Sequence, residues 1–259
     1  MRVAIILFCI FFLSFYCRGQ ERASKYINTE GKTVETRFKT PEHFKRVAAD
    51  PGSFGYYLRN LALKPHGSSV KYHDGRTKTN VNVYIAVVDM KIGKRDLEQC
   101  ADAVMRLRGE YLYQQKKYDA IHFNFLSDGK PRYYKNYAKG DYSYAKFKKY
   151  MNYIFAYANT ASLRNELKKV DAIKNMKIGD VFIQKGRPYG HAVIVVDVAK
   201  HHTTGETIFL LAQSYMPAQE TQILTNPNNR QLSPWYKAEE GALHTPEWQF
   251  DASDLRRFR

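Results

Sequence analysis

The fold of this chain is decided by residues 178–215, which read IGDVFIQKGRPYGHAVIVVDVAKHHTTGETIFLLAQSY. Three runs in this stretch are rich in Val, Ile, Leu and Phe and are separated by turn residues: Val181–Gln184, His191–Ala199 and Ile208–Tyr215. Such runs predict β-strands, and Gln222–Leu224 predicts a fourth. The turn at Thr204-Gly205 predicts that the last two of the three runs pair as a hairpin. We therefore expect an antiparallel sheet in the C-terminal half.

The residues before this stretch carry mainly helical patterns. The clearest predicted helix runs from Asp96 to about Lys116, and further helices are expected at 53–60, 145–158 and 162–170. Thr40-Pro41 predicts another helix start, because Thr is a favoured N-cap and Pro suits the first helical turn, and this helix should end before Pro51. Two strands are expected at 81–90 and 121–126. Helices followed by an antiparallel sheet are typical of an α+β fold.

The composition places this chain among ordinary globular proteins. Its 259 residues are 44% hydrophobic and 25% charged, and the mean hydropathy is -0.54. These fractions disfavour disorder and collagen-like structure. No linker rich in Pro, Gly and Ser divides the sequence, so we expect one domain over 20–259, with the site-bearing part at roughly 96–225. There is no Cys-x-x-Cys pair, which excludes a zinc ribbon or a thioredoxin-type redox site.

The first nineteen residues have the pattern of a secretory signal peptide. Arg2 is followed by the apolar run Val3–Tyr16, and cleavage is expected before Gln20. An N-terminal membrane anchor is the alternative. Attachment of lipid at Cys17 is less favoured, because a large residue, Tyr16, precedes it. We expect export to the periplasm or cell envelope, with no transmembrane segment in the mature chain.

The formal net charge of +16 favours anionic partners. Nucleic acid is not expected as a partner, because the predicted signal peptide directs the chain out of the cell. An anionic polymer of the cell envelope fits both features.

Cys100 is the only cysteine after the predicted signal peptide. Such a cysteine is buried and inert, paired between chains, or a nucleophile. Asp96 begins a D-x-x-Q pattern that resembles a capping box, so Cys100 should lie near the start of its helix. The positive end of a helix lowers the pKa of a thiol and favours the nucleophilic thiolate. The alternative is a core position, because Cys100 also belongs to an apolar stripe at helical spacing.

His191 and Gln213 are the other candidates for a catalytic site. His191 follows the turn Pro188-Tyr189-Gly190 and begins an apolar strand, where its imidazole could act as a base for a thiol. Gln213 interrupts the next apolar strand and could orient the ring through a hydrogen bond. Asp197 and Ser214 are alternative orienting residues, and Gln213 could instead mark the outward face of its strand.

This series of segments resembles papain-like cysteine hydrolases of the NlpC and CHAP type. The likeness consists of a cysteine that opens a helix, then GDVFI at 179–183, then GHAVIVV at 190–196, then a polar residue on the following strand. It implies an antiparallel sheet with helices packed on it and a helical N-terminal part. It further implies Cys100 as nucleophile, His191 as general base and Gln213 as orienting group, in a family that cleaves amide bonds of peptidoglycan.

The chain as a whole resembles an exported family, found mostly in Bacteroides-like bacteria, that is catalogued as domain of unknown function 4846. The likeness rests on RDLEQCADAVMRLR at 95–108 and LAQSYMPAQ at 211–219, together with SPWY at 233–236 and TPEW at 245–248. This resemblance implies no activity.

These observations favour an exported cysteine hydrolase that cleaves an amide or peptide bond. Peptidoglycan peptide is the expected partner, and no metal or organic cofactor is required. The alternative is a non-catalytic exported protein for binding or envelope assembly that has the same fold.

Overall fold

A computed structural model gives the fold of this protein, and residues 25–259 are described. A nine-stranded antiparallel sheet forms the centre. Seven strands follow the order β2-β9-β8-β7-β6-β13-β5, while β1 pairs with β7 and β10 with β8. The bounds of these strands are β1 Phe44–Arg46, β2 Tyr84–Val87, β5 Lys168–Lys169, β6 Val181–Gln184, β7 His191–His201, β8 Thr207–Gln213, β9 Gln222–Leu224, β10 Tyr236–Lys237 and β13 Leu255–Arg257.

The core of the sheet is the β6–β9 meander, and its strands match the four runs predicted from the sequence. Successive side chains of β7 belong to two different hydrophobic clusters, one on each face of the sheet. Ala192 and Ile194 face the cluster that contains the long helices, and Val193 and Val195 face the other. Burial on both faces explains why the sequence of β7 is continuously apolar rather than alternating.

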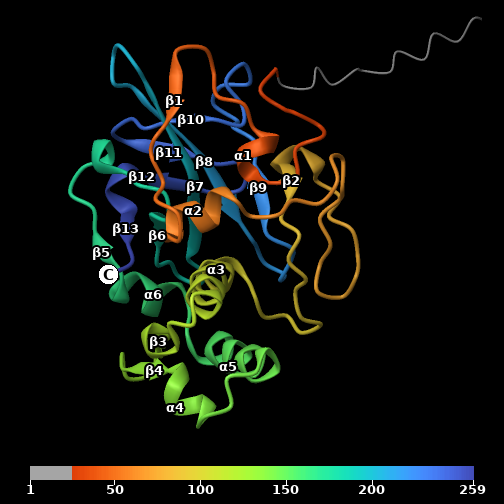
Figure 1. Ribbon diagram of the computed structural model, residues 1–259, viewed down its shortest axis with the longest axis vertical. Coiled ribbons are helices and arrows are strands. Elements are labelled where there is room, and N and C mark those ends of the chain that lie inside the picture. The colour runs from red at the N-terminus through yellow and green to blue at the C-terminus, as the bar shows by residue number, and fades with distance from the viewer. Residues whose placement is uncertain (1–24) are drawn as a thin grey trace, which may run out of the picture.

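Helices cover one face and one end of this sheet (Figure 1). The longest, α3, packs against β7, and the α4–α6 segment gathers at the same end of the molecule, beside the short β3–β4 hairpin. The fold is thus α+β with an antiparallel sheet and several helices, as the sequence predicts. The bounds are α1 Val34–Arg37, α2 Phe54–Arg59, α3 Cys100–Gln114, α4 Tyr134–Ala138, α5 Tyr144–Tyr157, α6 Thr160–Glu166, β3 His122–Asn124 and β4 Pro131–Tyr133.

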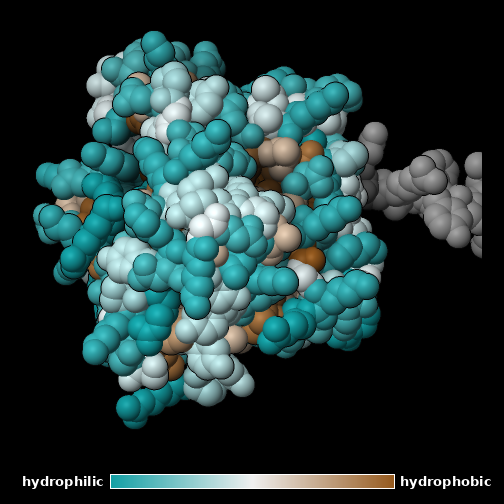
Figure 2. Space-filling view, turned by 60° about the horizontal axis from the view of Figure 1, so that its bottom comes forward, coloured by the Kyte–Doolittle hydropathy of each residue, from teal (hydrophilic) through white to brown (hydrophobic). Residues whose placement is uncertain are grey.

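The tyrosine-rich segment between α3 and α5 forms part of the core. Tyr134 is fully buried, and its ring lies 5.6 Å from that of Phe147 and 5.2 Å from that of Tyr150. The surface over this end of the molecule is mostly hydrophilic, and apolar residues show only as small separate spots (Figure 2). These aromatic rings therefore stabilise the attachment of the helical segment to the sheet.

Two predicted helices need correction. The helix expected at 162–170 ends at Glu166, and Lys168–Lys169 forms strand β5. The segment after Thr40-Pro41 is not a helix, because Phe44–Arg46 pairs antiparallel with the far end of β7 as strand β1. His43 takes a left-handed backbone conformation with φ 64°, which a helix does not allow. Arg46 Nε then lies 2.6 Å from the buried carboxylate of Asp197. Backbone pairing and an ion pair made with residues far along the chain outweigh the local capping signal.

The C-terminal segment covers the second face of the sheet. The small hairpin β11 Ala242–His244 and β12 Gln249–Asp251 places Phe250 on the cluster that contains Val193. The part of the chain that the structure describes also contains four short 3-10 turns, η1 Val81–Val83, η2 Tyr118–Ala120, η3 Ile173–Asn175 and η4 Ala252–Asp254. In residues 25–259 no helix is long and apolar enough to cross a membrane.

Candidate functional site

Cys100 is the first residue of α3. Its N-cap is Gln99 and not Asp96, because Asp96 instead accepts hydrogen bonds from Gln99 Nε2 at 3.0 Å and from the Ala218 N–H at 2.7 Å. The helix therefore begins four residues later than predicted, and the thiol lies in its first turn. Cys100 is 4% exposed.

The thiol of Cys100 lines a cleft of about 220 Å³ between α3, the start of α6 and the loop before β7. Its Sγ atom lies 3.9 Å from Thr160 Oγ1 and 3.9 Å from the Gly190 carbonyl oxygen. The cleft also exposes groups that could contact a ligand, namely Asp96, Gln99, Asn159, Lys185 and Tyr189.

The sulfur of Cys100 lies where β8 separates from β7. The backbone N–H and C=O of Val195 bond to Asp180 and Gly179, on the β6 side of β7. Successive residues of a strand direct their backbone groups to opposite neighbours, so those of Ala192 and Gly190 point toward β8. Pairing of β7 with β8 begins only at Ile194, which is opposite Ala212. The Ala192 N–H consequently has no partner in β8, and it is one of the groups that favour the thiolate of Cys100. The sulfur therefore touches the backbone on both sides of His191.

The pKa of the Cys100 thiol is raised to about 11, mainly by burial and to a smaller extent by the nearby carboxyl of Asp102. Hydrogen bonds from Thr160, Ala101 and Ala192 act in the opposite direction but are weaker. The sequence predicted a lowered pKa from the helix start alone, and this expectation is reversed because desolvation outweighs the helix end. The thiol is neutral in the resting protein.

His191 is buried, with 1% of its surface exposed. Its ring packs against Tyr215 and Trp248 at centroid distances of 4.8 and 5.3 Å, and Phe250 is 5.8 Å away. Burial lowers the pKa of His191 to about 4, so the imidazole is neutral at physiological pH. A neutral ring carries one proton, and its neighbours decide which nitrogen holds it.

Gln213 orients this ring. Its Oε1 atom lies 2.9 Å from His191 Nε2, and an amide oxygen can only accept, so Nε2 carries the proton. The other nitrogen, Nδ1, is buried and has no hydrogen-bond partner in the described part of the chain. Its lone pair is therefore free. Within residues 25–259, Nδ1 makes no hydrogen bond to Cys100 Sγ. Cys100 nevertheless lies close enough to Tyr215 to raise the pKa of the Tyr215 phenol, and Tyr215 packs on the His191 ring.

The two alternative orienting residues have other partners. Asp197 is fully buried, and its carboxylate is bound by Arg46 and by Arg59, whose Nε lies 2.8 Å away. Ser214 Oγ lies within hydrogen-bond distance of two carbonyl oxygens, 3.0 Å from that of Glu98 and 2.6 Å from that of Gln219. Of the three candidates, Gln213 is the one hydrogen-bonded to His191.

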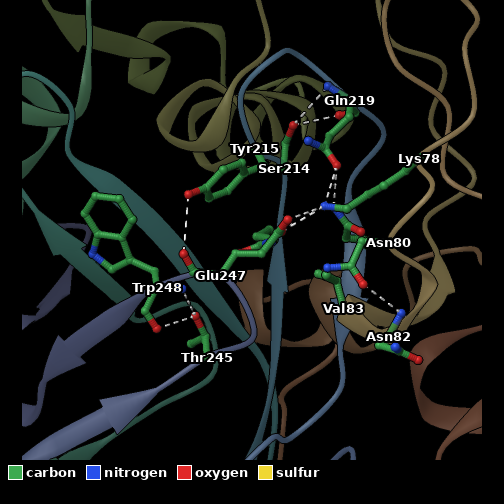
Figure 3. A network of polar contacts seen from close by, with 12 residues as sticks. Lys78, Asn80, Asn82, Val83, Ser214, Tyr215, Gln219, Thr245, Glu247 and Trp248 are labelled. Atoms are coloured by element: carbon green, nitrogen blue, oxygen red, sulfur yellow. Dashed lines mark hydrogen bonds and ion pairs between the residues drawn. The ribbon is translucent and has the colours of Figure 1, made fainter.

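Two residues of the site were missed in the sequence. Glu247 Oε2 accepts a hydrogen bond from Gln213 Nε2 at 2.7 Å. Lys78 Nζ lies 2.8 Å from both carboxylate oxygens of Glu247 and 3.0 Å from Gln219 Oε1 (Figure 3). Glu247 belongs to the TPEW run noted above, which offered a signal, whereas nothing in the sequence near Lys78 distinguishes it from other lysines. Within residues 25–259, no group of three or more His, Cys, Asp or Glu side chains could hold a metal ion.

Comparison with known proteins identifies a family. The model of a family described as Domain of unknown function (4846) matches residues 34–257, which include every residue of the site. No curated protein and no solved structure matches the chain.

Proposed function

This chain belongs to the family of domain of unknown function 4846, and we propose that it is a cysteine hydrolase that cleaves an amide bond, with Cys100 as nucleophile, His191 as general base and Gln213 as orienting group. The observation that carries the proposal is the free lone pair of His191 Nδ1. The ring tautomer is set by Gln213, and the sulfur contacts the backbone immediately before and after the same histidine.

The proposed reaction begins with two neutral groups. His191 Nδ1 removes the thiol proton as Cys100 Sγ attacks the carbonyl carbon of the substrate, which forms a C–S bond and places negative charge on the carbonyl oxygen. The N–H groups of Cys100 and Ala101 open α3 and have no acceptor inside the helix, so they are placed to stabilise that oxyanion.

The intermediate then collapses. The C–N bond breaks, the amine leaves with the proton from Nδ1, and a thioester remains on Cys100. Water, deprotonated by the same nitrogen, hydrolyses the thioester and restores the thiol. The burial of both groups supports a mechanism in which the proton moves only when substrate is present, rather than one with a permanent thiolate–imidazolium pair.

A papain-like fold of the NlpC and CHAP type is part of the proposal. It is supported by a cysteine at the start of a helix that packs on an antiparallel sheet, a histidine at the start of a sheet strand, and an amide on the adjacent strand that bonds to the histidine. Trp248 adds a ring that packs against the His191 imidazole.

We further propose peptidoglycan peptide, or another anionic polymer of the envelope, as the substrate of an exported, Bacteroides-type protein. The net charge of +16 and the exposed Lys185 and Tyr189 at the cleft support an anionic ligand with carbohydrate or peptide character. The predicted signal peptide at 1–19 and the less favoured lipid site at Cys17 lie outside the described residues, so location in the periplasm or cell envelope is part of the proposal.

Purified peptidoglycan offers a test of the substrate. The full chain is incubated with sacculi and with soluble muropeptides, and new amino groups are quantified and assigned by mass spectrometry. We expect release by the wild-type protein and none by Cys100→Ala, with Gln231→Ala, a control at an exposed position outside the cleft, retaining release. Release that is equal in wild type and Cys100→Ala would exclude Cys100 as the nucleophile.

The second candidate function is non-catalytic binding in the envelope. The 4% exposure of Cys100 and its raised pKa favour this function, because an inert cysteine is expected to be buried and protonated. It predicts that muropeptides bind without being cleaved, and that Cys100→Ala binds them as tightly as the wild type.

A further inference from the structure

The side-chain amide of Gln213 is held at both ends. Its oxygen faces His191 Nε2 at 2.9 Å, and its nitrogen faces Glu247 Oε2 at 2.7 Å. An amide can also lie in the flipped orientation, in which oxygen and nitrogen exchange places. The flip would turn the Gln213 oxygen toward a carboxylate oxygen, so that two acceptors would meet at hydrogen-bond distance.

We infer that Glu247, held in place by Lys78, is a positioning residue that sets the tautomer of His191 through Gln213. A carboxylate only accepts hydrogen bonds, so it fixes the nitrogen of the amide toward itself and the oxygen toward the ring. The ring must then carry its proton on Nε2. The inference deepens the proposed function, on which its catalytic meaning rests, because only this tautomer leaves Nδ1 free as a base.

Lys78 makes this arrangement rigid. Its side chain is 3% exposed, and its Nζ bonds to both oxygens of Glu247 and to Gln219 Oε1. Gln219 Oε1 also accepts from Gln222 Nε2 at 3.0 Å. Figure 3 shows Lys78 reaching Glu247 and Gln219 from the side opposite Trp248, while the Tyr215 hydroxyl meets the backbone oxygen of Glu247. Both the side chain and the main chain of Glu247 are therefore anchored.

A purely structural ion pair is the competing explanation. Burying a lysine costs solvation energy, and burial is the largest influence on the pKa of Lys78, which it lowers, while Glu247 opposes it. Buried ion pairs often stabilise no better than apolar residues of the same shape. If the pair served stability alone, its neutral replacement would leave the His191 ring unchanged.

The tautomer of His191 can be measured directly by ¹⁵N NMR, because the protonated and unprotonated ring nitrogens differ widely in chemical shift. The full chain, labelled on histidine, is compared with the double variant Lys78→Met with Glu247→Gln, which removes both charges and retains the shape. The control is Lys64→Met with Glu220→Gln, a Lys–Glu pair at 2.5 Å that does not contact Gln213.

We expect the Nε2–H tautomer alone in the wild type and the control, and a mixture with the Nδ1–H tautomer in the double variant. A wild-type ring with its proton on Nδ1, or a double variant that keeps Nε2–H alone, overturns the inference. Glu247→Gln alone gives the same readout if the double variant does not fold. The NMR test is independent of the proposed function. If Cys100 proves unreactive, the proposed function fails, but the expected tautomers of His191 stay the same.

Discussion

His191 Nε2 lies 2.9 Å from Gln213 Oε1, across the end of two neighbouring strands, and this contact determines which ring nitrogen is free. His191 begins β7, and Gln213 ends β8. The two strands separate at this point, which leaves room for the sulfur of Cys100 against the backbone of residues 190 and 192. The proposed chemistry depends on that local separation of β7 from β8.

Gln213→Leu should slow the alkylation of Cys100. Without the amide, the ring has no partner that keeps its proton on Nε2, and we expect a loss of about tenfold or more in the second-order rate with iodoacetamide at pH 7. The rate is followed by intact-protein mass spectrometry. Gln231→Leu, at an exposed position, is the control and should react like the wild type. Equal rates in all three proteins would argue that Gln213 has no orienting role.

Thr160→Val should raise the pKa of Cys100 further. The variant keeps the shape of the side chain but removes the hydroxyl, which lies 3.9 Å from Sγ and favours the thiolate. The pH profile of alkylation should therefore move toward higher pH. Thr204→Val, in the hairpin turn, serves as the control. A profile that moves toward lower pH would contradict the described contact.

Asp197→Asn should destabilise the protein without changing the site. The substitution leaves the buried Arg59 without its counter-charge, which is expected to lower the free energy of unfolding by about 3 kcal/mol. Urea denaturation measures this change, and Asp74→Asn, which lies in an exposed ion pair, should have a much smaller effect. Cys100 in the folded Asp197→Asn variant should be alkylated at the wild-type rate; a tenfold loss would restore Asp197 as a candidate for the site.

His191 should make the protein sensitive to acid. Its pKa is about 4 in the folded state and 6.5 for an exposed histidine. Between these values the unfolded chain binds a proton that the folded protein does not, so stability falls as the pH decreases from 6.5 to 4, by about 3 kcal/mol from this group. His191→Gln should lose that part of the pH dependence, measured by urea denaturation at each pH, whereas His202→Gln should retain it. An unchanged slope in His191→Gln would mean that the ring is not buried in its neutral form.

The β6–β9 part of the sheet could be predicted because its information is local. The runs at β6–β9 are apolar and separated by turn residues, so these strands and the hairpin at Thr204-Gly205 are found in the predicted places. The helix predicted after Thr40 is wrong for the opposite reason. Its helix signal is local, but its structure is set by pairing with β7 and by the contact of Arg46 with Asp197.

Three residues of the candidate site could be singled out in the sequence, but its electrostatics could not be predicted. Cys100, His191 and Gln213 stand out because each interrupts or begins a regular pattern. The pKa of Cys100 depends on how deeply α3 packs against β7, which no local pattern reports. Glu247 and Lys78 are 169 residues apart, so their ion pair follows only from the complete fold.

The rate at which Cys100 reacts with iodoacetamide in the wild type and in His191→Ala tests the central claim most directly. A buried thiol with a pKa near 11 has very little thiolate at pH 7, so fast reaction requires a base beside it. We predict that the wild-type protein reacts at least about tenfold faster than His191→Ala at pH 7, while the control His202→Ala matches the wild type. Equal slow reaction in the wild type and His191→Ala would contradict a catalytic pair of Cys100 and His191.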